Sequence, residues 1–380
     1  MDLLTYHIGD EVDFPGLAIH RIPNIPFVKN VKPGPSWAKL LLDFFVLIKA
    51  VSMLIKNDYA VIHSHEEASF FAAFLAKIFR IKHIYDMHSS LPLQLINFRF
   101  GNNRLLIWLF GALEKWVLTT CDAVITIGTD LEELVNEINP DANIITIENL
   151  PLQNVLQPSG QGSVEQARRQ LALDSKSIVL YTGTLESYQG LDLLLDSAQI
   201  VNQRFSNVLF LLVGGSQSQV DYWKDVVAKK ELADTIILTG SVSLAEAIGY
   251  LELCDVLVSP RLDGTSIPLK LYTYLSSGKP LVATRTAGHT QILNDDLAIL
   301  TAPAKDEFAK GILELLLHPQ RGSSLGRQAQ LFMKEHYKVE YYVDALEGTY
   351  RSLNANCITE HEEPIPSGID TDMRVPDIDV

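Results

Sequence analysis

Two cations and a loop rich in serine and threonine lie together in residues 255–284, in a pattern suited to binding phosphate. An apolar run at 255–259 predicts a buried strand, and the polar loop after it leads into a helix predicted over 266–277. Arg261 lies in the loop and Lys270 in the first turns of the helix. A helix N-terminus flanked by cations favours an anionic phosphate. The alternative is an ordinary strand–helix–strand crossover whose polar loop is only solvated.

Two glycine-bearing turns follow predicted strands in the same half of the chain. Gly183 and Thr184 come directly after one apolar run, and Gly214 and Gly215 come directly after the next. Turns of this kind let backbone N–H groups approach a phosphate closely. Their spacing matches neither a P-loop nor the dinucleotide fingerprint, so a plain strand-to-helix turn is the alternative. Together with the two cations, the turns predict a pocket for a nucleotide diphosphate.

Polar residues also follow two predicted strands in the first half of the chain. His88 and Ser89 come after one strand, and His65 and Glu66 after the strand before it. Ligands of parallel α/β sheets bind beyond the carboxyl ends of the strands, so His88 is a candidate for catalysis or for sugar binding. Glu66 could bind the acceptor substrate of such a reaction. The alternatives are a hydrogen-bonded structural histidine and a solvated helix start.

No metal site is predicted. His63 and His65 are expected to point in opposite directions at the strand end and therefore not to share an ion. The three cysteines, Cys121, Cys254 and Cys357, lie far apart without a CxxC pair or a Cys/His cluster. This spacing argues against a disulfide framework and against structural zinc, and it favours a reducing cytoplasm.

Strand and helix patterns alternate in both halves, which predicts an α/β fold with parallel sheets covered on both faces. The predicted strands are residues 3–6, 17–21, 60–63, 83–86, 123–126, 144–147, 178–182, 208–213, 235–239, 256–259, 281–284 and 297–300. The predicted helices are residues 37–56, 68–79, 104–119, 131–138, 191–204, 220–230, 244–253, 266–277, 305–317, 321–335 and 339–353.

The overall size and charge restrict the kinds of protein that this chain can be. A length of 380 residues suggests two domains. The net charge of −15 argues against a nucleic-acid partner, because affinity for nucleic acid comes mainly from cations. The first residues lack the basic start of a signal peptide. Residues 151–163 have the composition of a linker, and the acidic segment 354–380 is predicted to be disordered.

Two helical segments are unusually rich in large apolar residues: 40–55 and 105–118. Such segments are typical either of helices that lie in a membrane interface or of helices buried in a large domain, and we favour the buried interpretation. Segment 40–55 is interrupted by Asp43 and Lys49 and is too short to span a bilayer.

With these pieces placed, the chain resembles glycosyltransferase family 4 (glycosyl transferases group 1). The resemblance covers nearly the whole chain except the tail. The segments that carry it are DYAVIHSHEE (58–67), IYDMHSSLP (84–92), CDAVITIGTDLEEL (121–134), TIENLPL (146–152), YTGTLESYQGLDLLLDSA (181–198), FLLVGG (210–215) and CDVLVSPRLDGTSIPLKLYTYLSSGKPLVAT (254–284).

The resemblance implies the GT-B fold, with two facing Rossmann-like domains. On this basis we predict an acceptor-side domain over 1–150, a nucleotide-sugar-binding domain over 164–336 and a helix returning to the first domain over 337–353. The implied reaction is a retaining sugar transfer from a nucleotide-diphosphate sugar, usually without a bound metal. No cofactor is then required, because helix N-termini and cations can stabilise the leaving diphosphate.

The resemblance also implies roles for individual residues. His88 matches the family's histidine that contacts the transferring sugar. The expected donor and phosphate site is formed by Gly183, Thr184, Gly214, Gly215, Arg261, Asp263, Thr265, Ser266, Lys270 and Thr273. The expected acceptor side is formed by His65, Glu66 and Ser89.

The chain departs from the family pattern in its donor site. The family's pair of glutamates, spaced E-x7-E, falls on Thr273 for the second position and on Thr265 or Asp263 for the first. The usual arginine and lysine of the first glycine loop fall on Thr184 and Gln189, which are neutral. The two cations of the 255–284 stretch are the expected replacements.

A further departure lies at the N-terminus. The family's first strand and glycine-rich loop would precede Met1, and we favour a lost upstream segment over a catalytically impaired protein.

The predicted function is a retaining glycosyltransferase that acts on a glycan or lipid-linked acceptor, in cell-surface polysaccharide or glycolipid synthesis. The predicted location is the cytoplasm, with peripheral contact at the inner face of the plasma membrane as an open option. The alternative is a non-catalytic binding or scaffold protein on a GT-B frame, and an epimerase on the same fold is a more distant third.

Overall fold

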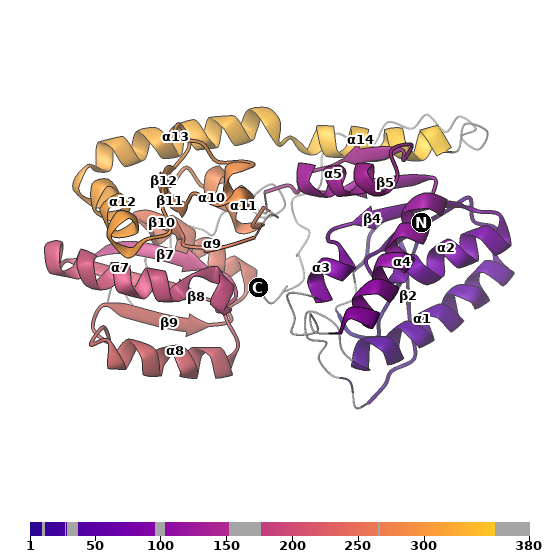
Figure 1. The fold of residues 1–380 in the computed structure, drawn as a ribbon, viewed down its shortest axis with the longest axis horizontal. Coiled ribbons are helices and arrows are strands. Elements are labelled where there is room, and N and C mark those ends of the chain that lie inside the picture. The colour runs from indigo at the N-terminus through magenta and orange to yellow at the C-terminus, as the bar shows by residue number, and fades with distance from the viewer. Residues whose placement is uncertain are drawn as a thin grey trace. The chain divides into compact units, whose positions relative to one another are not determined.

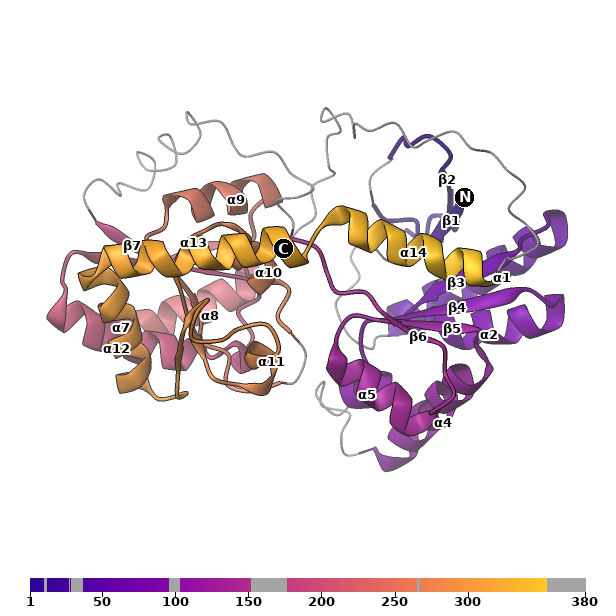
Figure 2. The same ribbon diagram turned by 90° about the horizontal axis from the view of Figure 1, so that it is seen from above.

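The computed structural model describes residues 1–9, 12–26, 28, 37–95, 103–151, 176–264 and 267–353. The chain forms two compact α/β units, drawn in Figures 1 and 2. Unit 1 contains Met1–Glu148 together with the last helix from Val343 onward, and unit 2 contains Asn149–Tyr342. The chain therefore passes from one unit to the other twice. The predicted linker, beyond residue 151, and the predicted disordered tail lie outside the described residues.

Unit 1 alternates strands and helices along its length. Its elements are β1 (Asp2–Thr5), β2 (Ala18–Arg21), α1 (Trp37–Lys56), β3 (Val61–His65), α2 (Ala68–Phe79), β4 (Lys82–Met87), α3 (Leu91–Leu95), α4 (Arg104–Thr120), β5 (Ala123–Thr126), α5 (Thr129–Ile138), β6 (Ile144–Thr146) and most of α14 (Val339–Leu353).

Strands β3 to β6 form a parallel sheet in the order β3-β4-β5-β6. Successive side chains of a strand face opposite sides of the sheet, and both sides are apolar here. Tyr85 packs on one side with residues of α2, α4 and α5. Ile84 packs on the other side, where Ala345 and Tyr350 of α14 cover it. Figure 2 shows α14 and α4 on opposite sides of this sheet. The layer arrangement places the carboxyl ends of β3 and β4 at one edge.

Strands β1 and β2 pair with each other in parallel, and neither pairs with another described strand. A groove of about 510 Å³ lies between β1 and β3. It is lined by consecutive residues of both strands, 2–6 and Val61–His65. Consecutive side chains of a strand point to opposite faces, so a groove against one face would be lined by every second residue. Because consecutive residues line this groove, both strands turn an edge toward it. The strand and glycine-rich loop expected upstream of Met1 remain a prediction.

Unit 2 is a larger unit of the same kind. Its six strands form one parallel sheet in the order β12-β11-β10-β7-β8-β9. Its elements are β7 (Ser177–Thr182), the short 3-10 helix η3 (Ser187–Gln189), α7 (Leu191–Arg204), β8 (Val208–Val213), α8 (Gln217–Lys229), β9 (Ile236–Gly240), α9 (Leu244–Leu253), β10 (Val256–Ser259), α10 (Lys270–Ser276), β11 (Leu281–Thr284), α11 (Ala287–Thr290), β12 (Ile299–Thr301), α12 (Lys305–Leu317) and α13 (Pro319–His336).

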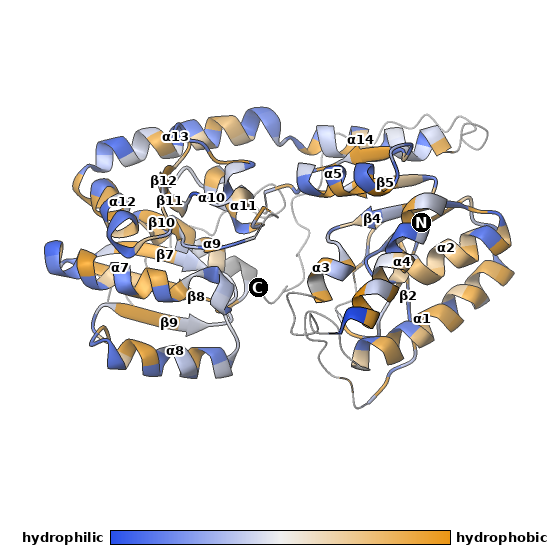
Figure 3. Ribbon diagram, in the orientation of Figure 1, coloured by the Kyte–Doolittle hydropathy of each residue, from blue (hydrophilic) through white to orange (hydrophobic). Residues whose placement is uncertain are grey.

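The sheet of unit 2 is buried on both faces. Val179 and Tyr181 of β7 belong to the apolar core on one face, and Ile178 and Leu180 belong to the core on the other. Figure 3 shows apolar and polar residues interleaved around α7 and α8, the pattern of helices that bury one side against a sheet. The predicted α/β class with parallel sheets is therefore correct for both units.

The helix predicted over 266–277 is shorter in the structure. Helix α10 begins at Lys270, and Ser266 lies outside the described residues. The Leu271 amide donates to the Pro268 carbonyl, three residues back, which is a turn rather than the four-residue bond of an α-helix. The helix start predicted at residue 266 is thus wrong, because Pro268 belongs to a turn that precedes α10.

The buried interpretation of the two apolar helices is also wrong. Helix α1 buries Leu42 and Val46, yet Phe44 on the same helix is 57% exposed. Trp108 of α4 is 67% exposed. Helices α1, α2 and α4 pack side by side, and Figure 3 draws much of α1 and α2 in the apolar colour. The exposed apolar residues of these three helices are Leu40, Leu41, Phe44, Ile48, Ile55, Phe74, Ile78, Leu105, Trp108 and Leu109. Within the described residues, no helix is long and apolar enough to cross a membrane.

Candidate active site

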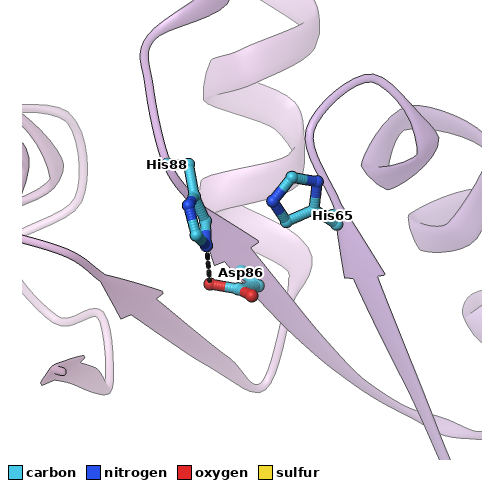
Figure 4. Close-up of side chains that lie close together, drawn as sticks. All are labelled: His65, Asp86 and His88. Carbon is cyan, nitrogen blue, oxygen red and sulfur yellow. Dashed lines mark ion pairs between the residues drawn. The ribbon is translucent and has the colours of Figure 1, made fainter. Parts of the chain in front are cut away.

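Four polar side chains gather where β3 and β4 end in unit 1, and we call them the histidine cluster: His63, His65, Asp86 and His88. The register of the two strands sets His65 directly opposite Asp86. His88 Nε2 lies 3.2 Å from Asp86 Oδ1, and the rings of His65 and His88 are 4.4 Å apart between centroids (Figure 4).

The expected orientation of His63 and His65 is wrong. Residues two apart on a strand face the same side, because the side-chain period of a strand is two residues. Accordingly, His63 Nε2 lies 3.7 Å from Asp86 Oδ2. The same Asp86 carboxylate also faces His65 and His88. Both histidines of β3 therefore approach Asp86.

Asp86 sets the charge of the histidine cluster. Burial alone would raise its pKa, but hydrogen bonds from His63 and His88 hold the pKa well below its usual range. The hydrogen bond to Asp86 in turn raises the pKa of His88, against the opposing effect of burial. Burial and the neighbouring His88 lower the pKa of His65. The arrangement favours a carboxylate beside a protonated His88 and a neutral His65, so His88 can donate a hydrogen bond to a ligand.

The loop after β4 is held in place by two carboxylates. Ser89 Oγ donates to Glu66 at 3.1 and 3.0 Å from its two carboxylate oxygens. Ser90 Oγ and the Leu91 amide both donate to Glu114 at 3.0 Å. Glu114 is only 3% exposed, and burial raises its pKa to about 7. Sequence reasoning did not single out Glu114; the signal was a lone carboxylate on an apolar helix, whose burial requires partners.

In unit 2, the glycine turns after β7 and β8 touch each other. A Cβ added to Gly214 would lie 2.3 Å from the Gly183 carbonyl oxygen, closer than real contacts allow. Gly183 and Gly214 have φ values of +131° and +114°, which side chains rarely adopt. Gly215 lies against the Leu185 side chain instead. These two turns therefore require glycine, and they bring backbone close to backbone at the carboxyl ends of the strands.

The Lys270 amine lies beside this turn. It donates to the Thr182 carbonyl at 3.2 Å and to Gln189 Oε1 at 3.3 Å, and it stands 3.9 Å from the centre of the Tyr181 ring. Among the described residues, no carboxylate is within ion-pairing distance of this amine. Burial, reinforced by the charge of Arg261, lowers the pKa of Lys270 to about 7.

Arg261 folds back on its own loop. Its Nε donates to the Asp263 carbonyl at 2.7 Å, and its guanidinium lies 5.5 Å from the centre of the Tyr188 ring. The carboxylate of Asp263 accepts from the Gly264 amide at 2.7 Å and is exposed. We call Gly183, Gly214, Arg261 and Lys270 the cation site.

Three threonines were also predicted to belong to the donor site, and the structure places them in different surroundings. Thr184 is exposed on the first glycine turn, and its carbonyl accepts from the Tyr181 hydroxyl. Thr273 is 7% exposed within α10. Thr265 lies, like the predicted cap, outside the described residues.

Sequence reasoning also missed His289. It is fully buried, contacts Ser259 and Thr284 at the ends of β10 and β11, and has its pKa lowered to about 4 by burial. It is a neutral structural histidine near the loop that carries Arg261.

Comparison with known proteins decides the family. The model of Glycosyltransferase Family 4 matches residues 3–150, and the model of Glycosyl transferases group 1 matches residues 176–318. The chain belongs to the family 4 glycosyltransferases. An uncharacterised glycosyltransferase of Haemophilus influenzae is 25% identical over 316 residues, which is 80% of each chain. The alpha-D-kanosaminyltransferase of Streptomyces kanamyceticus is 22% identical over 50% of this chain and 49% of its own.

Solved structures of other proteins share the GT-B fold of this glycosyltransferase. Sucrose-phosphate synthase from Thermosynechococcus elongatus has a TM-score of 0.74 at 18% identity, over 93% of this chain and 89% of its own. HepE from Anabaena in complex with UDP-glucose has a TM-score of 0.69 at 18% identity, over 88% of this chain and 86% of its own. The predicted family, fold and enzyme class are confirmed.

Proposed function

We propose that this glycosyltransferase moves a sugar, with retention of configuration, from a nucleotide-diphosphate sugar to a glycan or lipid-linked acceptor. The observation that supports this most directly is the cation site, where two cations and two close glycine turns meet at the ends of parallel strands. Such a place suits a diphosphate, because backbone N–H groups and cations stabilise its charge. HepE structures contain UDP and UDP-glucose, so UDP is the first nucleotide to test.

In the proposed reaction, the bond between the anomeric carbon and the diphosphate oxygen breaks as a bond to the acceptor oxygen forms on the same face of the sugar. The acceptor hydroxyl loses its proton to the departing diphosphate. Lys270 and Arg261 neutralise the charge that develops on the leaving group, so no metal ion is required. His88 donates a hydrogen bond to the transferring sugar. Asp86 positions His88 and, through their hydrogen bond, raises its pKa, which favours the protonated form.

The proposed acceptor side lies in unit 1, with His65, Glu66 and Ser89. A lipid-linked acceptor is favoured by the exposed apolar residues of α1, α2 and α4. The same helices or the turn after α2 carry exposed cations at Lys56, Lys77, Arg80, Arg104 and Lys115. Apolar side chains interleaved with cations are typical of surfaces that bind anionic lipids. We therefore propose a cytoplasmic protein in peripheral contact with the inner face of the plasma membrane, in cell-surface polysaccharide or glycolipid synthesis.

Calorimetric titration with UDP, GDP and ADP tests the donor. We expect saturable one-to-one binding of one nucleotide in the absence of divalent ions, followed by slow hydrolysis of the matching sugar nucleotide. A folded protein that binds none of the three would contradict the proposal. Flotation with vesicles of phosphatidylglycerol tests the membrane contact, with Trp108→Ser and Phe44→Ser expected to weaken it.

The second candidate function is a non-catalytic binding protein on the same frame. It is favoured by Thr273, a buried threonine where the family pattern places a carboxylate. Donor turnover that disappears in Lys270→Ala would exclude this alternative.

A further inference from the structure

The histidine cluster contains a set of metal ligands. His65, Asp86 and His88 each offer one ligand atom, and these three atoms all lie within 4.8 Å of one another. The three residues come from the ends of the adjacent strands β3 and β4, and Figure 4 shows the two rings and the carboxylate around one point. Within the described part of the chain, this is the one such group of histidine, cysteine or acidic residues.

The spacing suits a tetrahedral ion. Two ligands bound at ~2.0–2.1 Å and separated by a tetrahedral angle lie roughly 3.3–3.4 Å apart. Asp86 Oδ1 and His88 Nε2 are 3.2 Å apart, so the separation of this pair already matches that of two ligands of one ion. His65 is exposed, so its ring can turn toward the pair without displacing packed neighbours. Two imidazoles and a carboxylate, with water in the fourth position, are the ligands of an open zinc site.

The partners behind these ligands are already in place. While Asp86 Oδ1 faces the ligand pair, Asp86 Oδ2 faces His63 Nε2 at 3.7 Å. His63 is oriented in turn by the Tyr350 hydroxyl of α14, at 2.6 Å from its Nδ1. Partners of this kind fix the orientation of a metal-binding carboxylate, and their loss typically costs 10–100-fold in affinity.

We propose that His65, Asp86 and His88 bind Zn²⁺ or a similar divalent transition metal, and that the bound ion inhibits the enzyme. Binding would release the proton from the ring nitrogen of His88 that faces Asp86, and the ion would take its place on that nitrogen. The site discriminates against Mg²⁺, which prefers an all-oxygen octahedral shell. The binding itself is independent of the proposed function; the inhibition rests on it, because it requires His88 to contact the transferring sugar.

Calorimetry with Zn²⁺ on the tag-free protein, without nucleotide, tests the binding. We expect one saturable site for Zn²⁺, no heat with Mg²⁺, and intense visible absorption when Co²⁺ is added. His65→Ala and Asp86→Asn should each weaken Zn²⁺ binding by at least ~100-fold, and His63→Ala by about 10–100-fold. His65 is exposed, so its replacement leaves the core intact, and far-ultraviolet circular dichroism checks that each variant is folded.

His20 provides the matched control. It lies 3.3 Å from Asp2, a histidine–carboxylate distance similar to that of His88 and Asp86, but it belongs to no three-ligand group among the residues that the structure describes. His20→Ala should keep the affinity of the unmodified protein. The absence of a saturable Zn²⁺ site, or equal affinity in His65→Ala and the unmodified protein, would overturn the proposal.

The inhibition has a separate readout. Donor turnover is compared for each protein with and without Zn²⁺, and a chelator should restore it. Zn²⁺ that binds to His65, Asp86 and His88 without slowing turnover would overturn the inhibitory role while leaving the metal site intact. Failure of the proposed transfer reaction would instead appear as no turnover in the metal-free enzyme, with Zn²⁺ binding unchanged.

Discussion

The histidine cluster of unit 1 and the cation site of unit 2 both stand at the carboxyl ends of parallel strands, but their charges are balanced differently. In the histidine cluster, Asp86 is within 4 Å of both His63 and His88. In the cation site, burial and the nearby charge of Arg261 lower the pKa of Lys270, and within the described residues the hydrogen bonds of Lys270 go only to neutral oxygens. The first site is internally neutralised, whereas in the proposed function the diphosphate of the donor supplies the counter-charge of Lys270 in the second site.

The largest expected effect comes from removing the Lys270 charge. Lys270→Met should lower turnover of the sugar nucleotide by about 10²–10³-fold, because a cation aimed at the leaving group contributes most in the transition state. Steady-state kinetics measures this. Lys279 is the matched control, since its amine also donates to two neutral oxygens, both of the backbone, at 2.9 and 2.8 Å, but away from the cation site. Lys279→Met should leave turnover unchanged, and equal losses of turnover in both variants would remove the distinction between the sites.

The next effect concerns the glycine turns. Gly214→Ala should destabilise unit 2 by about 4 kcal/mol, from strained backbone and from the clash with the Gly183 carbonyl. Gly240→Ala should cost less, because Gly240 also has a positive φ of +80° but its added Cβ would meet only the Val220 side chain, at 3.6 Å. Fluorescence of Trp223, the tryptophan of unit 2, follows urea unfolding of this unit. Equal stability of the two variants would show that the backbone contact is not the constraint.

A comparable effect, dependent on pH, is expected at Glu114 beside the histidine cluster. Its folded pKa of about 7 is above the ordinary value of 4.5, so folding favours the protonated form. The stability it gives is present below pH 4.5 and is lost as the pH rises through 7. Glu114→Gln should therefore gain on the order of 3 kcal/mol over the unmodified protein between pH 5 and pH 8.

Tryptophan fluorescence of unit 1 during unfolding measures this difference. Gln can accept from the Leu91 amide and donate to Ser90, so the loop after β4 keeps its contacts. If the difference in stability between Glu114→Gln and the unmodified protein does not change with pH, the raised pKa of Glu114 is contradicted.

The smallest effect is a proton taken up with the nucleotide. The free Lys270 amine has a pKa of about 7, and a bound diphosphate raises that pKa. Above pH 7, binding of UDP should therefore take up as much as one proton, and affinity should fall up to about tenfold per pH unit until the pKa of the complex is passed. Calorimetry at pH 8 in two buffers of different ionisation enthalpy measures it. The same proton uptake in Lys270→Met would assign it to another group.

Much of the fold could be predicted from local pattern. The strands at 123–126, 208–213, 256–259 and 281–284 have the predicted bounds, since continuous apolar runs between breakers have few alternatives in a sheet buried on both faces. The helix predicted at residue 266 begins at Lys270 instead, because the turn made by Pro268 is decided by tertiary context. The exposed apolar residues of α1 were missed because periodicity identifies two faces of a helix but not what covers them.

The candidate site was predictable in part. The strand-end rule located His88, Gly183 and Gly214 from sequence alone. The rule could not show that Asp86 links two histidines, since that depends on the register between β3 and β4. Glu114 and His289 were missed for a similar reason: the partners of Glu114 are 23 and 24 residues away in sequence, and Ser259, one partner of His289, is 30 residues away, so they meet only in the folded unit.

The groove between β1 and β3 has a consequence for handling the protein. Each of these strands pairs on one side only, among the strands described, and consecutive residues of both line the groove, as expected of strands that turn an unpaired edge toward it. Unpaired edges of this kind template the addition of a strand from another molecule. Purified protein should therefore self-associate through unit 1 at high concentration. A charged substitution at Leu3, which is 45% exposed in β1, should suppress this self-association while leaving unit 2 unchanged.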